Sequence, residues 1–190
     1  MAICEHLIAA DIAASCATPI RAGVEQVGYI INKSDIESIV EEDGIVTSIA
    51  LKKGKHAYQI QQLGQQPFNG TQNEFVEGDY MNTFNKTVAF VVLGNSPSVS
   101  KDIIEPLANG EFVVIFENKY KVDSLQNAFE IVGTEVGARM TSASQNKYEN
   151  QSAWTIELLE TEVPTANKFV WNENYAKTKE MLEGLLTPAA

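Results

Sequence analysis

The chain has 190 residues and a formal net charge of −11 at pH 7, with 14 Lys and Arg residues against 25 Asp and Glu residues. Hydrophobic residues make up 44% and charged residues 21% of the sequence, which is typical of a globular protein and excludes a disordered chain. The acidic excess argues against a protein that clamps nucleic acid, because phosphate contacts need clustered cations.

The first 20 residues combine apolar spacing with an early proline. Ile3, Leu7, Ile8 and Ile12 are spaced as in a short amphipathic helix or a packed arm, and Pro19 limits that element. The segment lacks the basic start and unbroken apolar run of a secretory signal, so we expect a cytoplasmic site of synthesis. Nowhere do about 18 apolar residues run together, so no membrane span is expected.

Strand patterns dominate the next stretch of sequence. Residues 28–31 form a short apolar run, and residues 45–51 and 57–61 flank a charged turn at 52–56. This arrangement predicts a β-hairpin between the two flanking strands. Residues 36–40 fit either a helix or a strand.

Residues 63–85 differ in composition from the rest of the chain. They are rich in Gln, Asn and Gly, yet they contain aromatic residues and a methionine that a solvated loop would not need. Two interpretations stay open. The segment is either a loop that folds back on the core, partly in strands, or an arm whose aromatic side chains contact a neighbouring subunit.

The middle of the chain carries the clearest elements. Residues 86–93 are apolar on both faces and predict a central strand. A serine cap and the pair Asn109 and Gly110 delimit a helix over about 99–109, which Pro106 keeps short or kinked. Residues 111–117 predict the next strand.

The last third predicts a meander followed by a helix. Residues 128–132, 138–142 and 153–158 read as consecutive strands, the last two joined by a polar loop. Residues 172–186 predict a terminal helix with an Asn cap. Its apolar positions form one face: Tyr175, Met181, Leu182, Leu185 and Leu186.

The sequence offers little for catalysis or metal binding. Cys4, His6 and Cys16 are the only soft ligands close together, and they lack the paired spacing of a zinc site. No phosphate-binding glycine loop is present, and the abundant carboxylates follow no ligand spacing. We therefore predict no catalytic, cofactor-binding or metal-binding residue.

Several short blocks resemble small virion proteins of tailed phages of gut Bacteroidales, the crAss-like phages and their relatives. The blocks are residues 1–13 (Met-Ala-Ile-Cys-Glu-His-Leu-Ile-Ala-Ala-Asp-Ile-Ala), 28–35 (Gly-Tyr-Ile-Ile-Asn-Lys-Ser-Asp), 112–120, 137–144 (Gly-Ala-Arg-Met-Thr-Ser-Ala-Ser) and 154–158 (Trp-Thr-Ile-Glu-Leu). The resemblance spans much of the chain, but none of these blocks is a motif with a mechanism of its own.

The resemblance implies a structural subunit of the head–tail connector or tail, which forms a homo-oligomeric ring around the DNA channel. Twelvefold symmetry, neighbouring portal or tail ring proteins, and double-stranded DNA that passes without specific binding are then expected. The acidic balance suits a channel that must not hold DNA. Alternatives are another virion role (capsid decoration, fibre base or cargo) and a cytoplasmic enzyme that works with paired carboxylates. A secreted adhesion module fits less well, because no signal segment is visible.

The fold class expected is mainly β (α+β). One domain would contain a β-sandwich or curled antiparallel sheet with a short flanking helix, an N-terminal arm and a C-terminal helix. The residues predicted to contact other subunits are Ile3, Leu7, Ile8, Phe68, Phe75, Tyr80, Met81 and Phe84.

Overall fold

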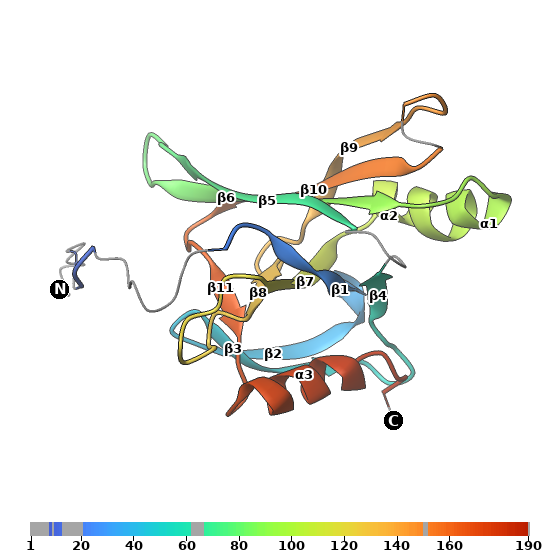
Figure 1. The fold of residues 1–190 in the computed structure, drawn as a ribbon. Coiled ribbons are helices and arrows are strands. Elements are labelled where there is room, and N and C mark those ends of the chain that lie inside the picture. The colour runs from blue at the N-terminus through green and yellow to red at the C-terminus, as the bar shows by residue number, and fades with distance from the viewer. Residues whose placement is uncertain (1–7, 9, 13–20, 62–66, 150–151, 190) are drawn as a thin grey trace.

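Two β-sheets and one C-terminal helix form three layers in the computed structural model (Figure 1). The structure describes residues 8, 10–12, 21–61, 67–149 and 152–189. The mainly β, sandwich-like fold with a short helical segment and a C-terminal helix confirms the predicted fold class. Most of the predicted N-terminal arm lies outside the described residues.

The larger sheet has seven strands in the order β2-β3-β11-β8-β7-β1-β4. All its neighbouring strands are antiparallel except β11 and β3, which run parallel. Its strands are β1 (Val24–Asn32), β2 (Ile36–Glu42), β3 (Ile45–Leu51), β4 (Tyr58–Gln61), β7 (Phe112–Asn118), β8 (Phe129–Val132) and β11 (Lys168–Val170).

The smaller sheet has four antiparallel strands in the order β5-β6-β10-β9. They are β5 (Phe68–Val76), β6 (Thr83–Val92), β9 (Arg139–Gln145) and β10 (Trp154–Val163). The central position of β6 between β5 and β10 confirms the central strand predicted at 86–93.

Strand β7 divides the apolar interior into two cores. Phe112, Val114 and Phe116 pack toward the smaller sheet, whereas Val113 and Ile115 pack toward the C-terminal helix. Successive side chains of a strand point to opposite faces, so the five apolar residues that begin β7 serve both cores. The larger sheet is therefore the middle layer.

Helix α3 (Tyr175–Gly184) covers the outer face of this middle layer (Figure 1). The Asn174 side chain caps it by accepting a hydrogen bond from the Lys177 backbone N–H at 2.9 Å. The predicted apolar face is confirmed. Its members are buried or packed against the second core: Tyr175, Met181, Leu182, Leu185 and Leu186.

A short helical segment follows β6 and confirms the helix predicted at about 99–109. It consists of α1 (Pro97–Val99), the π-helical turn η2 (Ser100–Ile104) and α2 (Glu105–Asn109). The Ser96 hydroxyl caps it by accepting from the Val99 N–H at 3.2 Å.

The hairpin predicted between residues 45–51 and 57–61 is wrong. Both segments are strands, but β3 and β4 lie near opposite edges of the larger sheet. The turn after β3 bonds instead to the C-terminal segment, where the Ala57 N–H donates to the Leu185 carbonyl at 2.7 Å. Strand β3 pairs with β2 across Asp43 and Gly44, both at positive φ as a two-residue hairpin turn requires.

The structure decides one open alternative and corrects one expectation. Residues 36–40, left open between helix and strand, belong to β2. The predicted meander is split, because β8 belongs to the larger sheet and β9 to the smaller one. The connection between them turns sharply at Gly133, where a Cβ atom would lie 2.1 Å from the Phe112 carbonyl oxygen. Strand β11 and the 3-10 turn η1 (Lys33–Asp35) were not predicted.

Candidate functional site

The β5–β6 hairpin is the part of the predicted contact segment that extends away from the body of the protein (Figure 1). Phe68 lies at its root and is only 5% exposed. Its ring packs against Phe116 in the core between the sheets, with ring centroids 6.1 Å apart. The prediction of Phe68 as a subunit contact is thereby corrected, because a core side chain presents no surface to a neighbour.

The far end of the hairpin has a different character. Phe75 and Phe84 occupy paired positions on β5 and β6, with ring centroids 6.1 Å apart in an edge-to-face arrangement. Phe75 is 57% exposed, Met81 is 64% exposed and Tyr80 is fully exposed, while Phe84 is half-buried. We call these four residues the aromatic tip.

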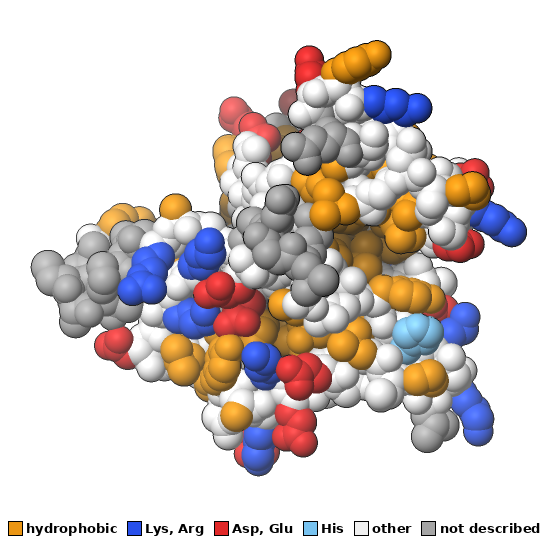
Figure 2. Space-filling view, turned by 45° about the vertical axis from the view of Figure 1, so that its right-hand side comes forward, with side chains coloured by type: hydrophobic (Ala, Val, Ile, Leu, Met, Phe, Trp, Pro, Cys, Tyr) orange, Lys and Arg blue, Asp and Glu red, His pale blue; other side chains and the backbone are white. Residues whose placement is uncertain are grey.

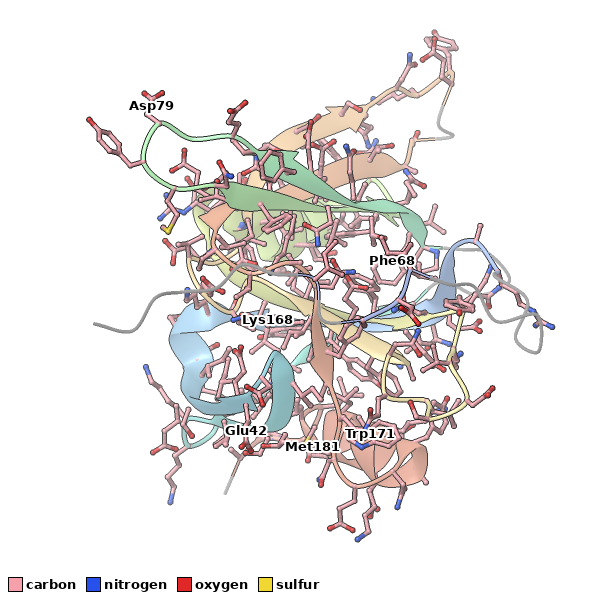
Figure 3. The ribbon with its side chains drawn as sticks, turned by 90° about the vertical axis from the view of Figure 1, so that its left-hand side faces the viewer. Glu42, Phe68, Asp79, Lys168, Trp171 and Met181 are labelled. Atoms are coloured by element: carbon pink, nitrogen blue, oxygen red, sulfur yellow. The ribbon has the colours of Figure 1, made fainter. Side chains whose placement is uncertain are left out.

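The loop that closes the hairpin holds the aromatic tip outward. Figure 3 shows Asp79 at the end of this loop, far from Phe68 at the opposite end of β5. The Gly78 N–H donates to the Asn82 side chain at 3.4 Å, and a Cβ atom on Gly78 would lie 2.4 Å from the Met81 carbonyl oxygen. A tight turn therefore places Tyr80 and Met81 at the outer end. The described part of this segment thus has its root in the core and an exposed tip, and contact of the tip with a neighbouring subunit stays a prediction.

The predicted contacts near the N-terminus are only partly described. Ile8 is described and is 81% exposed. Ile3 and Leu7, like the Cys4, His6 and Cys16 group, lie outside the described residues. Among the residues that are described, no three His, Cys, Asp or Glu side chains gather as metal ligands would, and no helix is long and apolar enough to span a membrane.

A buried charge network joins the two sheets and was not found from the sequence. Lys168, at the start of β11, pairs with Glu41 Oε2 at 2.9 Å and Glu135 Oε1 at 2.8 Å. Glu160 of β10 is fully buried and accepts hydrogen bonds from the backbone N–H groups of Gly133 and Glu135 at 2.8 and 2.9 Å. These contacts hold the connection from β8 to β9, so the network serves the fold.

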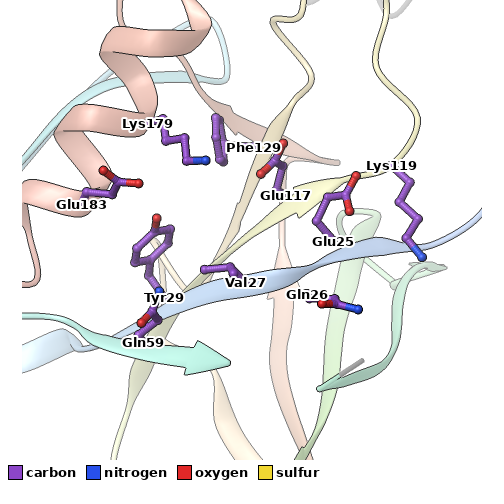
Figure 4. A pocket seen from close by; sticks show the side chains of 10 residues that line it. All are labelled: Glu25, Gln26, Val27, Tyr29, Gln59, Glu117, Lys119, Phe129, Lys179 and Glu183. Carbon is purple, nitrogen blue, oxygen red and sulfur yellow. The ribbon is translucent and has the colours of Figure 1, made fainter. Parts of the chain in front are cut away.

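A pocket of about 360 Å³ opens between the larger sheet and α3 (Figure 4). Val27, Tyr29 and Phe129 form its apolar walls. Burial raises the pKa of Tyr29 to about 12, with further contributions from the nearby charges of Glu183 and Glu117. The phenol is therefore protonated at neutral pH and acts as a hydrogen-bonding group.

The same pocket contains the carboxylates that the enzyme alternative would need. Glu117 and Glu25 both lie near Lys121 Nζ, at 3.0 and 3.5 Å. Glu117 also accepts a hydrogen bond from the Tyr175 hydroxyl at 2.7 Å. Both carboxylates are thus paired with one shared cation.

A second, smaller cavity of about 120 Å³ lies between the sheets. It is lined by Lys86 and Thr87 of β6, Glu130 and Val132 of β8, and Asn167 before β11, among others. Lys86 is 2% exposed, and its Nζ atom has no hydrogen-bond partner among the described residues. A buried, unpartnered amine is costly to keep charged, so this cavity stands apart from the well-paired network around Lys168.

Comparison with known proteins identifies no relative. No protein-family model matches the chain, no curated protein resembles it significantly, and no solved structure does so either.

Proposed function

We propose that the protein is a structural subunit that assembles with copies of itself through the aromatic tip. The observation that carries this proposal is the β5–β6 hairpin, whose root is fixed in the core and whose tip exposes Phe75, Tyr80 and Met81. A hairpin held this way presents its apolar end at a fixed distance from the body.

Exposed aromatic side chains at the end of a projecting element favour a contact function. Apolar groups that gather in solvent mark interaction sites, and Tyr and Phe contribute strongly when a partner buries them. The hairpin sequence from Phe68 to Asn85 contains no Lys, Arg or His, but it contains Glu77 and Asp79 beside the aromatic tip. The surface that receives the tip is therefore expected to be apolar with neutral or basic surroundings.

We propose further that the assembly is a ring of the head–tail connector or tail of a tailed phage, stacked on portal or tail ring proteins in the virion. A ring needs two different complementary surfaces on each subunit, and a projecting tip that docks on another part of its neighbour meets this requirement. The resemblance of the short sequence blocks and the charge of −11 support a channel through which DNA passes.

The face shown in Figure 2 bears on where such a channel would lie. Acidic and basic side chains are interspersed there, so the described residues form no uniformly acidic wall on this face. The surface lining a DNA channel is therefore expected on another face of the subunit.

Light scattering across a concentration series tests assembly directly. The wild-type chain is expected to form closed oligomers, and the double variant Tyr80→Ser, Met81→Ser is expected to be a monomer with an unchanged melting temperature. Tyr148→Ser provides the matched control, because Tyr148 is equally exposed but lies in the connection between β9 and β10. That control should assemble like the wild type.

Two results would contradict the proposal. A wild-type chain that stays monomeric at every concentration would contradict self-assembly. A tip variant that assembles normally would show that the aromatic tip is not the contact. Electron microscopy of the assembled species then tests the ring. Closed rings with a central opening are expected, whereas open filaments would count against the connector or tail ring.

A further inference from the structure

Lys86 sits in a row of polar residues on the inner face of the smaller sheet. It lies directly opposite Asn73 on β5 and directly opposite Glu160 on β10. Residues opposite each other on neighbouring strands place their Cβ atoms about 5 Å apart on the same face. Because Lys86 is 2% exposed, this face is the one turned toward the larger sheet.

The surroundings of Lys86 make the neutral amine more accessible than it is for a lysine in water. Burial lowers its pKa, and the charges of Glu160 and Glu135 oppose that effect only in part. Lys86 lines the 120 Å³ cavity, and its Nζ atom is buried with no hydrogen-bond partner among the described residues. A neutral, desolvated lysine amine is a nucleophile, whereas an ammonium is not.

Glu130 faces the same cavity from the larger sheet. Burial raises its pKa, although hydrogen bonds from the side chains of Asn118 and Asn167 and the charge of Lys86 act in the opposite direction. Glu130 therefore tends toward the protonated acid in which it can give up a proton. The cavity thus brings the Lys86 amine and the Glu130 carboxyl group together, and its walls include the apolar residues Phe116 and Val132.

Asn167 completes the group with an amide carbon that can be attacked. It lines the cavity and hydrogen-bonds Glu130, and its Oδ1 atom accepts a hydrogen bond from the Asn73 side-chain amide. That donor polarises the Asn167 carbonyl and lies where negative charge would develop. Asn167 is an exposed residue, so released ammonia can reach solvent.

We propose that Lys86 and Asn167 form an intramolecular isopeptide bond across the 120 Å³ cavity, with Glu130 as the proton-transfer group and Asn73 as the donor to the amide oxygen. The Lys86 amine attacks Cγ of Asn167, so that a C–N bond forms and the carbonyl electrons move onto Oδ1. The bond from Cγ to Nδ2 then breaks. Glu130 gives its proton to the leaving nitrogen and takes one from the Lys86 nitrogen.

The reaction balances without any further reagent. An amine and a primary amide become a secondary amide and one ammonia molecule, with no change of oxidation state. The bond would join β6 of the smaller sheet to the residue just before β11 of the larger sheet, part-way along the projecting hairpin between its root and its tip. It would thus fix the two layers to each other, and it does not depend on whether the protein assembles.

Mass spectrometry of the purified wild-type chain tests the bond. Its formation removes one ammonia molecule, about 17 Da, from the mass expected from the sequence. Trypsin cuts after Lys and Arg, so a linked digest should contain residues 56–101, uncut at Lys86, joined to residues 148–168. Fragmentation should place the link between Lys86 and Asn167.

Variants separate this bond from other losses of ammonia. Lys86→Met, Asn167→Ala and Glu130→Gln should each restore the full mass, while circular dichroism reports that they fold. Lys101→Met and Asn109→Ala are matched controls on the surface, and their masses should still be lower by one ammonia molecule than their sequences predict. A succinimide at an Asn-Gly pair also removes ammonia, but it leaves the two tryptic peptides unlinked. A wild-type digest in which residues 56–86 and 148–168 appear only as separate peptides would overturn the proposal.

Discussion

Phe68 lies directly over Gly28, so closely that a Cβ atom on this glycine would be 2.4 Å from Phe68 Cζ. The same Cβ atom would lie 2.8 Å from the backbone oxygen of Ile115, which cannot move without disturbing β7. The Phe68 ring at the root of the β5–β6 hairpin therefore packs directly against the backbone of β1 at Gly28. This contact is what allows the opposite end of the hairpin to project from the body at a fixed angle.

Substitutions at this contact should destabilise the whole fold. Gly28→Ala is expected to cost about 1–3 kcal/mol through overpacking, and Phe68→Ala about 3–5 kcal/mol through loss of a buried ring. Urea unfolding followed by circular dichroism measures both. Gly70→Ala is the matched control on the same hairpin, because a Cβ atom there meets nothing within 4 Å. Equal effects at Gly28 and Gly70 would contradict the close packing at the root.

The turn between β2 and β3 depends on glycine in another way. Gly44 has a φ of 79°, and Asp43 before it also has positive φ, at 50°. Gly44→Ala is expected to cost about 1 kcal/mol in unfolding free energy, because a Cβ atom disfavours the left-handed region. Gly184→Ala, at the end of α3 where space is open, should instead be neutral or slightly stabilising. Equal losses for the two variants would contradict this account.

The positions of most strands could be predicted because their apolar patterns are local in the sequence. Which strands pair with each other in the sheets could not be predicted in the same way. Asp43 followed by Gly44 is the stronger hairpin signal in the sequence, and giving it more weight than the Lys-rich turn at 52–55 would have paired β2 with β3. Strand β11 has three residues, too few for a pattern. The composition of residues 63–85 leaves Phe68 as either a core residue or a subunit contact, and the space above Gly28, distant in sequence, makes it a core residue.

The buried polar residues were missed for a related reason. Lys86 and Glu160 stand in β6 and β10 among apolar and polar residues, where a charged residue is typical of a solvated face. Their opposite positions on β6 and β10 appear only when the strands are paired. The cavity beside Lys86 adds residues from β5, β8 and the segment before β11, which no sequence spacing connects.

Glu160 should be essential for the connection between the sheets. Its carboxylate accepts from the backbone N–H groups of Gly133 at 2.8 Å, Glu135 at 2.9 Å and Val136 at 3.3 Å. Glu160→Gln places an amide N–H where an acceptor is needed, so we expect a loss of about 2–3 kcal/mol in unfolding free energy. Glu157→Gln is the control on the same strand and should change stability little, because among the described residues its side chain has one long contact, with the Thr141 hydroxyl at 3.4 Å. Similar losses in both variants would contradict the anchoring role.

Lys168 links two carboxylates, and the link should be visible in the pH dependence of stability. Burial works to lower the pKa of Lys168, but its hydrogen bonds with Glu135 and Glu41 outweigh burial and raise it. Burial likewise works to raise the pKa of Glu135, while the hydrogen bonds from Lys168 and Thr165 outweigh it and lower the pKa. Each group is thus held in its charged form by the other.

The signs follow from linkage between protonation and folding. A lowered carboxyl pKa stabilises the fold above the ordinary Glu range, and this contribution is lost as pH falls through the lowered value. A raised lysine pKa stabilises the fold below the ordinary Lys range, and this contribution is lost as pH rises through the raised value. The stability difference between wild type and Lys168→Met should therefore be flat from about pH 5 to about pH 10 and shrink on both sides.

Between about pH 5 and about pH 10, we expect Lys168→Met to lower the free energy of unfolding by about 1–3 kcal/mol. This loss is smaller than for a fully buried ion pair because Glu41 and Glu135 are partly exposed. Lys177→Met is the control, since its partner Glu173 lies with it on the exposed surface of the α3 region, where an ion pair contributes little. Urea unfolding at a series of pH values measures both variants. A Lys168→Met penalty that persists undiminished in acid would show that the lost methylene packing, rather than the pairing with Glu135, accounts for it. If Lys177→Met lowered the free energy of unfolding as much as Lys168→Met does, the burial of Lys168 and its two carboxylate partners would not explain the loss.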